Sequence, residues 1–127
     1  MAEFTPVLYL KSSCPFCLKV ATYLASIGEF ADMEIRAFWP DEPEDEVIRK
    51  ELEGKTEKVS FPTLQFAPGQ YMIESDQIIE RYRQKSGVDP ESLPFYQYVI
   101  NGPMRRMREQ FAEIKRLNGI VDENVQA

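Results

Sequence analysis

The only two cysteines of this 127-residue chain, Cys14 and Cys17, are separated by two residues in the sequence CPFC. Two thiols at this spacing can close a disulfide within one helical turn, so the pair can alternate between dithiol and disulfide. The thiolate is the attacking species in such exchange, and a helix N-terminus favours it, because unpaired backbone N–H groups and the helix dipole stabilise negative charge. With Lys11 as a nearby cation, we expect Cys14 to be an exposed nucleophile with a lowered pKa. Cys17 lies one turn further on and is expected to be the more buried, resolving thiol.

A strand and a helix are expected to position this pair. The apolar run over residues 6–10 predicts a β-strand, and apolar residues at helical spacing over 14–28 predict a helix. Ser12 and Ser13, between the two, have the side chains of helix N-caps. Two cysteines at this spacing can also simply pack in a core. Their position between a strand and a helix favours a redox site instead.

The rest of the chain predicts further strands and helices in alternation. After the first helix we expect a strand over residues 33–39 and a helix over 44–52 with Pro43 in its first turn. Strands over 63–66 and 71–73 follow, and then a helix that Ser75 caps and that ends at Gly87. Residues 89–102 read as a connection to a last helix that opens at Pro103, with an apolar face of Met104, Met107, Phe111 and Ile114. The sequence thus predicts an α/β fold with a four-stranded mixed sheet flanked by helices. We expect a domain over residues 1–88, and a linker with a C-terminal helical extension over 89–127 that packs on it.

Composition excludes several classes of function. The net charge is −6, with 21 acidic and 15 basic residues, which argues against nucleic acid as the main partner. The acidic excess gathers in residues 29–57, where a solvated face is the simplest interpretation. The absence of histidine excludes Cys-His and Ser-His-Asp nucleophile systems and, with two cysteines, most zinc sites, so no metal is expected.

The sequence also bears on the compartment. No apolar run approaches the roughly 20 residues of a membrane span, so no membrane association is expected. The N-terminus lacks the basic and apolar regions of a signal peptide. Two cysteines do not form a disulfide framework of the secreted kind. We therefore expect a cytoplasmic protein.

A second motif, Phe61-Pro62, comes directly before the strand expected over residues 63–66. A proline there can merely begin an edge strand. Alternatively its peptide bond is cis and turns the backbone of Phe61 toward the thiols. The Phe61 N–H and C=O could then pair with an extended peptide.

Taken in order, the segments KSSCPFC (11–17), FPTL (61–64) and ESD (74–76) give residues 6–87 a resemblance to the glutaredoxins. The chain is equally similar to the N-terminal, thioredoxin-fold domain of glutathione S-transferases. Glutaredoxins usually carry a Gly-Gly pair just before the site of the γ-glutamyl group, where this chain has residues 71–73. The pair Glu74-Ser75 that follows is the one typical of glutathione S-transferases. The helix expected from Pro103 resembles the first helix of a transferase C-terminal domain.

The resemblance implies a thioredoxin-like fold and glutathione as the co-substrate. Cys14 would attack a glutathione mixed disulfide, and Cys17 would resolve a mixed disulfide with a protein. The implied glutathione contacts are Lys11, Phe16, Phe61, Pro62, Glu74, Ser75 and Asp76. Among them the Phe61 backbone would meet the cysteinyl part. The segment 74–76 would receive the γ-glutamyl end, and Lys11 the glycine carboxylate. Glu74-Ser75 can also be a simple helix cap, and Lys11 an exposed charge.

Three hypotheses follow. The first is a glutaredoxin-like oxidoreductase that uses glutathione to reduce disulfide-containing or glutathionylated proteins. The second is a non-catalytic, transferase-like module that binds glutathione or a protein. In either case, the last helix could pack on the domain, dock a partner or form a homodimer. The third is an iron–sulfur cluster held between two protomers by Cys14 of each and two glutathiones.

Overall fold

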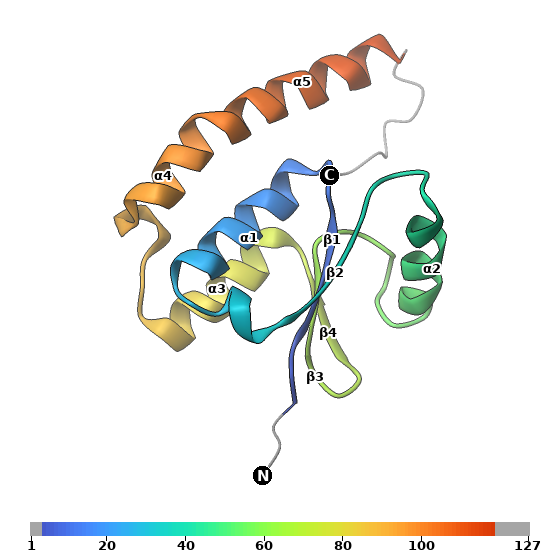
Figure 1. Ribbon diagram of the computed structural model, residues 1–127, viewed down its shortest axis with the longest axis horizontal. Helices are drawn as coiled ribbons and strands as arrows, with labels where there is room; N and C mark the ends of the chain where they lie inside the picture. Colours follow the sequence, from blue (N-terminus) through green and yellow to red (C-terminus); the bar gives the residue numbers. More distant parts are fainter. Residues whose placement is uncertain (1–3, 119–127) are drawn as a thin grey trace.

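The structure, a computed structural model, describes residues 4–118 and has one β-sheet at its centre (Figure 1). Its strands are β1 (Val7–Lys11), β2 (Glu34–Phe38), β3 (Thr63–Ala67) and β4 (Gln70–Ile73), in the order β2-β1-β3-β4. β1 runs parallel to β2 and antiparallel to β3, and β4 pairs antiparallel with β3. This is the mixed four-stranded sheet of a thioredoxin-like fold, so the predicted fold class is confirmed.

Helices lie on both sides of the sheet. α1 (Pro15–Ser26) and α3 (Ser75–Ser86) pack together on one side, and α2 (Pro43–Leu52) packs beside β2 on the other. Their apolar residues recur at helical spacing, so one face of each helix enters the core. The fully buried core side chains come from strands and helices alike, and include Leu8, Leu24, Ile48, Leu52, Leu64 and Ile78.

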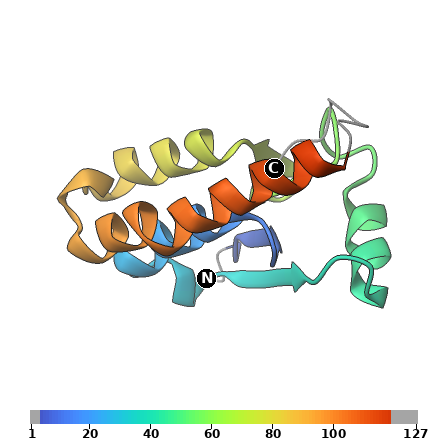
Figure 2. The same cartoon turned by 90° about the horizontal axis from the view of Figure 1, so that it is seen from above.

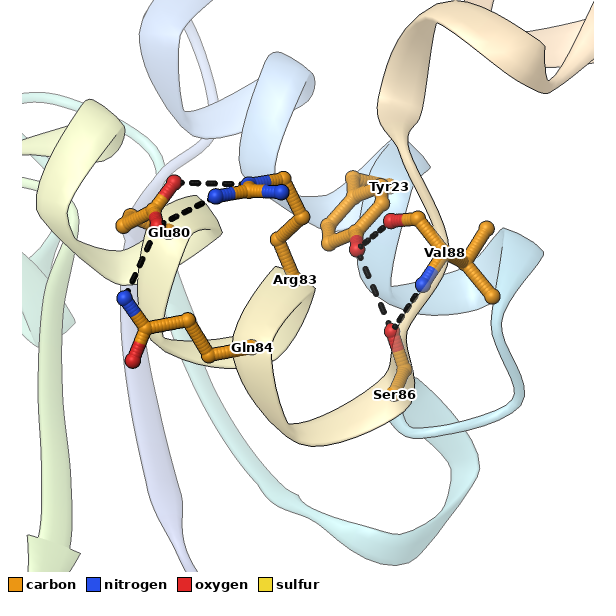
Figure 3. Close-up of polar contacts among 6 residues, drawn as sticks. All are labelled: Tyr23, Glu80, Arg83, Gln84, Ser86 and Val88. Atoms are coloured by element: carbon orange, nitrogen blue, oxygen red, sulfur yellow. Dashed lines mark hydrogen bonds and ion pairs between the residues drawn. The ribbon is translucent and has the colours of Figure 1, made fainter.

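A hydrogen bond joins the far ends of α1 and α3 (Figure 3). The hydroxyl of Tyr23, on α1, is buried and donates to the carbonyl oxygen of Val88 at 2.6 Å. The same hydroxyl lies 3.4 Å from the Ser86 hydroxyl. Buried hydroxyl groups need such partners, so this contact fixes where the chain leaves α3.

Both predicted serine caps are wrong. A turn closed by the Cys14 N–H and the Lys11 carbonyl oxygen contains Ser12 and Ser13, so α1 begins one residue later and Cys14 is its N-cap. Likewise Ser75 is the first residue of α3, and Glu74 takes the cap position with a φ of 79°. Neither cap side chain bonds the helix backbone.

The predicted connection over residues 89–102 is also wrong, because it contains a 3₁₀ turn (Pro90–Ser92) and the helix α4 (Pro94–Asn101). Pro94 takes the first turn of α4, where a missing N–H costs nothing. Tyr96 and Val99, three residues apart, face the core, and the Tyr96 ring meets Tyr23 edge-on at 6.0 Å. This apolar pair is the signal that shows a helix rather than a loop.

The last helix is confirmed as α5 (Pro103–Leu117), which follows α4 across α1 (Figures 1 and 2). Met104 is buried, whereas Met107 and Phe111 are half-buried. Ile114 is 57% exposed, so the predicted apolar face meets the protein only over its first turns. Dimerisation through this helix stays a prediction.

The division at residue 88 likewise stays a prediction. Residues 1–3 of the expected domain and 119–127 of the expected extension lie outside the described part. Within residues 4–118, no helix combines the length and the apolar character needed to cross a bilayer.

Candidate active site

Cys14 and Cys17 lie at the N-terminus of α1, beside the end of β1. Both residues are 3% exposed and belong to the hydrophobic core, together with Phe61. The expectation that Cys14 is exposed is therefore wrong, and the exposed fraction does not distinguish it from Cys17.

The two thiols differ sharply in acidity. A hydrogen bond from the Cys17 thiol lowers the pKa of Cys14 to about 6, with further help from the backbone N–H groups of Cys17 and Phe16 and from the charge of Lys11. The same hydrogen bond, together with burial, raises the pKa of Cys17. The Cys17 sulfur also accepts the Lys11 backbone N–H at 3.3 Å. Near neutral pH the site thus holds a thiolate at Cys14 and a thiol at Cys17.

The direction of this pKa shift matches the expectation from sequence, but its main cause does not. The helix N-terminus and Lys11 were expected to activate Cys14. Instead the Cys17 thiol contributes most, the N–H groups come next, and Lys11 contributes least. The spacing of the two cysteines carries this signal, because it brings the second thiol within hydrogen-bonding reach of the first.

A cavity of about 240 Å³ reaches the CPFC segment at Phe16, whereas Cys14 and Cys17 are not among the residues that line it. Its walls come from the motif, from the segment before β3 and from the start of α3. They are Phe16, Lys58, Ser60, Phe61, Pro62, Glu74, Ser75 and Asp76. Every predicted glutathione contact except Lys11 lines this one cavity.

The sequence interpretation missed two of these wall residues, Lys58 and Ser60. Both lie just before Phe61-Pro62, so proximity to that motif was the available signal. The Ser60 carbonyl oxygen accepts the Thr63 hydroxyl at 2.6 Å, which closes the loop around the motif. Lys58 is exposed and adds a cation to the cavity wall.

The peptide bond between Phe61 and Pro62 is cis, which is the second of the two interpretations of this motif. The Phe61 ring packs edge-on against Phe38, with 4.8 Å between ring centroids. The Arg49 guanidinium, from α2, lies over both rings at 5.3 and 5.6 Å and bonds the Asp45 carboxylate. α2 therefore holds the side chain of Phe61, a residue that lines the cavity.

Lys11 is half-buried at the end of β1, outside the cavity walls. Its charge acts on Cys14 and on the Asp45 carboxylate of α2. It thus lies near both the Cys14 thiol and the Asp45 carboxylate. Its predicted contact with the glycine carboxylate stays a prediction.

Glu74 holds a backbone conformation that L residues rarely adopt, with φ 79° and ψ 119°. We expect Glu74→Gly to raise the free energy of unfolding by about 1 kcal/mol, because glycine relieves the strain. The same change should weaken glutathione binding, since it removes a carboxylate from the cavity. Thermal unfolding and calorimetric titration measure the two effects.

Asp41 offers a matched control, because it also has a positive φ, 68°, and lies outside the cavity walls. Asp41→Gly should stabilise the protein without changing the affinity for glutathione. If both glycine variants left the affinity unchanged, Glu74 would have no role in binding.

Comparison with known proteins gives one family and two solved structures. A family model described as Glutaredoxin matches residues 7–71, just over half of the chain. A search of curated proteins gives no match. The glutathione transferases Omega 3C and Omega 2C from Trametes versicolor have TM-scores of 0.46 and 0.45 and are 20% and 18% identical in sequence. The matches cover 66% and 87% of this chain but only 33% and 46% of the transferases, so the chain spans less than half of either.

Proposed function

The chain belongs to the glutaredoxin family, and from this premise we propose that it is a glutathione-dependent thiol–disulfide oxidoreductase. Its substrates are glutathionylated proteins and protein disulfides. The observation that carries the proposal is a thiolate at Cys14, with a pKa of about 6, in a motif whose Phe16 lines a cavity formed by three separate segments. We assign this activity to residues 1–88.

In the proposed reaction, the Cys14 thiolate attacks the glutathione sulfur of a mixed disulfide. A bond forms between Cys14 and glutathione, the old S–S bond breaks, and the protein substrate leaves as a thiolate. A second glutathione thiolate then attacks the glutathione sulfur on Cys14, which releases oxidised glutathione and restores the Cys14 thiolate. Cys17 keeps its proton throughout and stabilises the Cys14 thiolate by hydrogen bonding.

A protein disulfide requires both cysteines. Cys14 attacks one sulfur and forms a mixed disulfide with the substrate. Cys17 then loses its proton and attacks Cys14, so that the enzyme becomes the disulfide and the substrate the dithiol. Glutathione reduces the enzyme in turn.

We propose that glutathione lies along the cavity. The backbone of Phe61 pairs with its cysteinyl part, while Glu74, Ser75 and Asp76 receive the γ-glutamyl end. Pro62 and Phe16 border the chain between them. The glycine carboxylate meets a cation, for which Lys11 and Lys58 are the two candidates. A cytoplasmic location fits this chemistry, because it supplies reduced glutathione.

The lowered pKa of Cys14 favours this proposal over a non-catalytic module, which has no use for a reactive thiolate. The test is an NMR titration of the Cys14→Ser variant with reduced glutathione, in which no disulfide can form at position 14. We expect saturable shifts of the amide signals of Phe16, Phe61, Glu74 and Ser75. Free cysteine at the same concentration is the control. Shifts absent from these residues would refute the site.

A further inference from the structure

Lys19 of α1 and Asp76 of α3 form an ion pair at one wall of the cavity. The Lys19 ammonium nitrogen lies 2.7 Å from Oδ1 of Asp76 and 5.9 Å from the centre of the Phe16 ring. Both Asp76 and Phe16 are cavity residues. The Lys19 side chain is only 17% exposed, whereas that of Asp76 is 87% exposed. The lysine therefore lies behind the aspartate, with its stem covered and its charge at the cavity edge.

This pair has unused bonding capacity. An ammonium group offers three donors, and within residues 4–118 Asp76 is the acceptor that Lys19 bonds. A carboxylate offers about four acceptor positions, of which Lys19 uses one. An ion pair with one exposed partner adds little to stability, so it can rearrange around a ligand at little cost.

We propose that Lys19 and Asp76 together bind a zwitterionic α-amino-acid group, and that Lys19 selects its carboxylate. The ammonium of the ligand donates to Asp76 while its carboxylate accepts from Lys19, so the two opposed ion pairs satisfy all four charges. The inference rests on the proposed function, in which the ligand is the γ-glutamyl end of glutathione. It adds Lys19 as a residue that determines specificity.

The charges around the cavity support this role. Glu74 and Asp76 place two carboxylates at the γ-glutamyl end. Without Lys19 these two charges would attract the ammonium of the ligand but repel its carboxylate. With Lys19 in place the same end accommodates a group of zero net charge.

A purely structural role for the pair predicts something different. α1 and α3 are already joined by buried apolar side chains, including Val20 and Ile78, and by the Tyr23 hydroxyl bond to Val88. A structural tie would affect stability and would lower the affinity for all ligands equally. A binding role affects only ligands that carry the α-carboxylate.

The test compares two ligands that differ in that carboxylate alone. Calorimetric titration measures the affinity for S-methylglutathione and for its analogue with 4-aminobutyrate in place of the γ-glutamyl group. The protein is the Cys14→Ser variant, alone or with Lys19→Met, Lys19→Arg or Lys85→Met. Lys85 is the matched control, because it pairs with Glu29 at 3.2 Å and lies outside the described walls of the cavity.

We expect the Cys14→Ser protein to prefer S-methylglutathione by about tenfold, the effect of one charge-assisted hydrogen bond. Lys19→Met should remove this preference by weakening S-methylglutathione alone. Lys19→Arg should keep most of it, and Lys85→Met all of it. The inference is overturned if Lys19→Met leaves the preference for S-methylglutathione unchanged. It is also overturned if the Cys14→Ser protein shows no such preference. Calorimetric titration does not depend on disulfide exchange, so it tests binding separately from the proposed activity. If the preference depends on Lys19 but the protein does not turn over mixed disulfides, the proposed oxidoreductase activity is refuted and this inference still holds.

Discussion

Replacing Cys14 with serine is expected to abolish reduction of a glutathionylated peptide, with a loss of at least about a thousandfold. The reason is that the remaining thiol is a poor nucleophile: the substitution removes the Cys14 hydrogen bond that raises the pKa of Cys17 most, but burial still raises that pKa. Cys17→Ser should retain much of the activity, because the glutathione route uses only Cys14 and the serine hydroxyl can still donate to its thiolate. Turnover is followed by the glutathione disulfide released from a glutathionylated peptide.

Ser12→Ala is the control, because Ser12 carries an exposed hydroxyl beside the motif. This change should leave the turnover of the glutathionylated peptide unaltered. An equal loss in Cys14→Ser and Cys17→Ser would contradict the glutathione route. That outcome would indicate a thioredoxin-like mechanism, in which the second thiol is essential for every substrate.

The rate at which Cys14 is alkylated should rise with pH to a plateau, with a midpoint near 6. Only the thiolate reacts, and the lowered pKa means that the thiolate predominates above pH 6. Below the midpoint the rate should fall about tenfold per pH unit as the thiol is protonated. Iodoacetamide reaction of the reduced protein over pH 4–9, read by mass spectrometry, measures the profile.

Cys17→Ala should move this midpoint upward, because the Cys17 thiol is the largest cause of the lowered pKa. Lys11→Met should move it upward by less, since the Lys11 charge contributes least. A wild-type midpoint near 8.5, the value of free cysteine, would contradict the account. So would a larger effect from Lys11 than from Cys17.

Sequence periodicity was sufficient for the sheet and for most helices, because their apolar faces follow regular spacing. It failed for α4, where the prolines and tyrosines of a short helix resemble those of a loop. It also misjudged how far Cys14 is exposed, since Cys14 packs in a core cluster built from segments far apart in the sequence. Such a property comes from packing and leaves no pattern in the sequence.

The residues of the candidate site also differ in how far the sequence predicts them. CPFC and Phe61-Pro62 are local motifs, and their chemistry can be derived from residue types and spacing. Lys19 meets Asp76 across 57 residues of sequence, and no pattern links them. Lys58 lies in a polar stretch with no regular spacing, so its nearness to Phe61-Pro62 was the one sequence signal that could have assigned it to the cavity.

The central claim is that the Cys14 thiolate attacks glutathione rather than the protein part of a mixed disulfide. It is tested most directly by mixing the Cys17→Ser variant with a glutathionylated peptide and measuring the intact mass of the protein within the first turnover. The account predicts an adduct of one glutathione on Cys14 and release of the free peptide. An adduct of the peptide on Cys14, or no adduct, would contradict it.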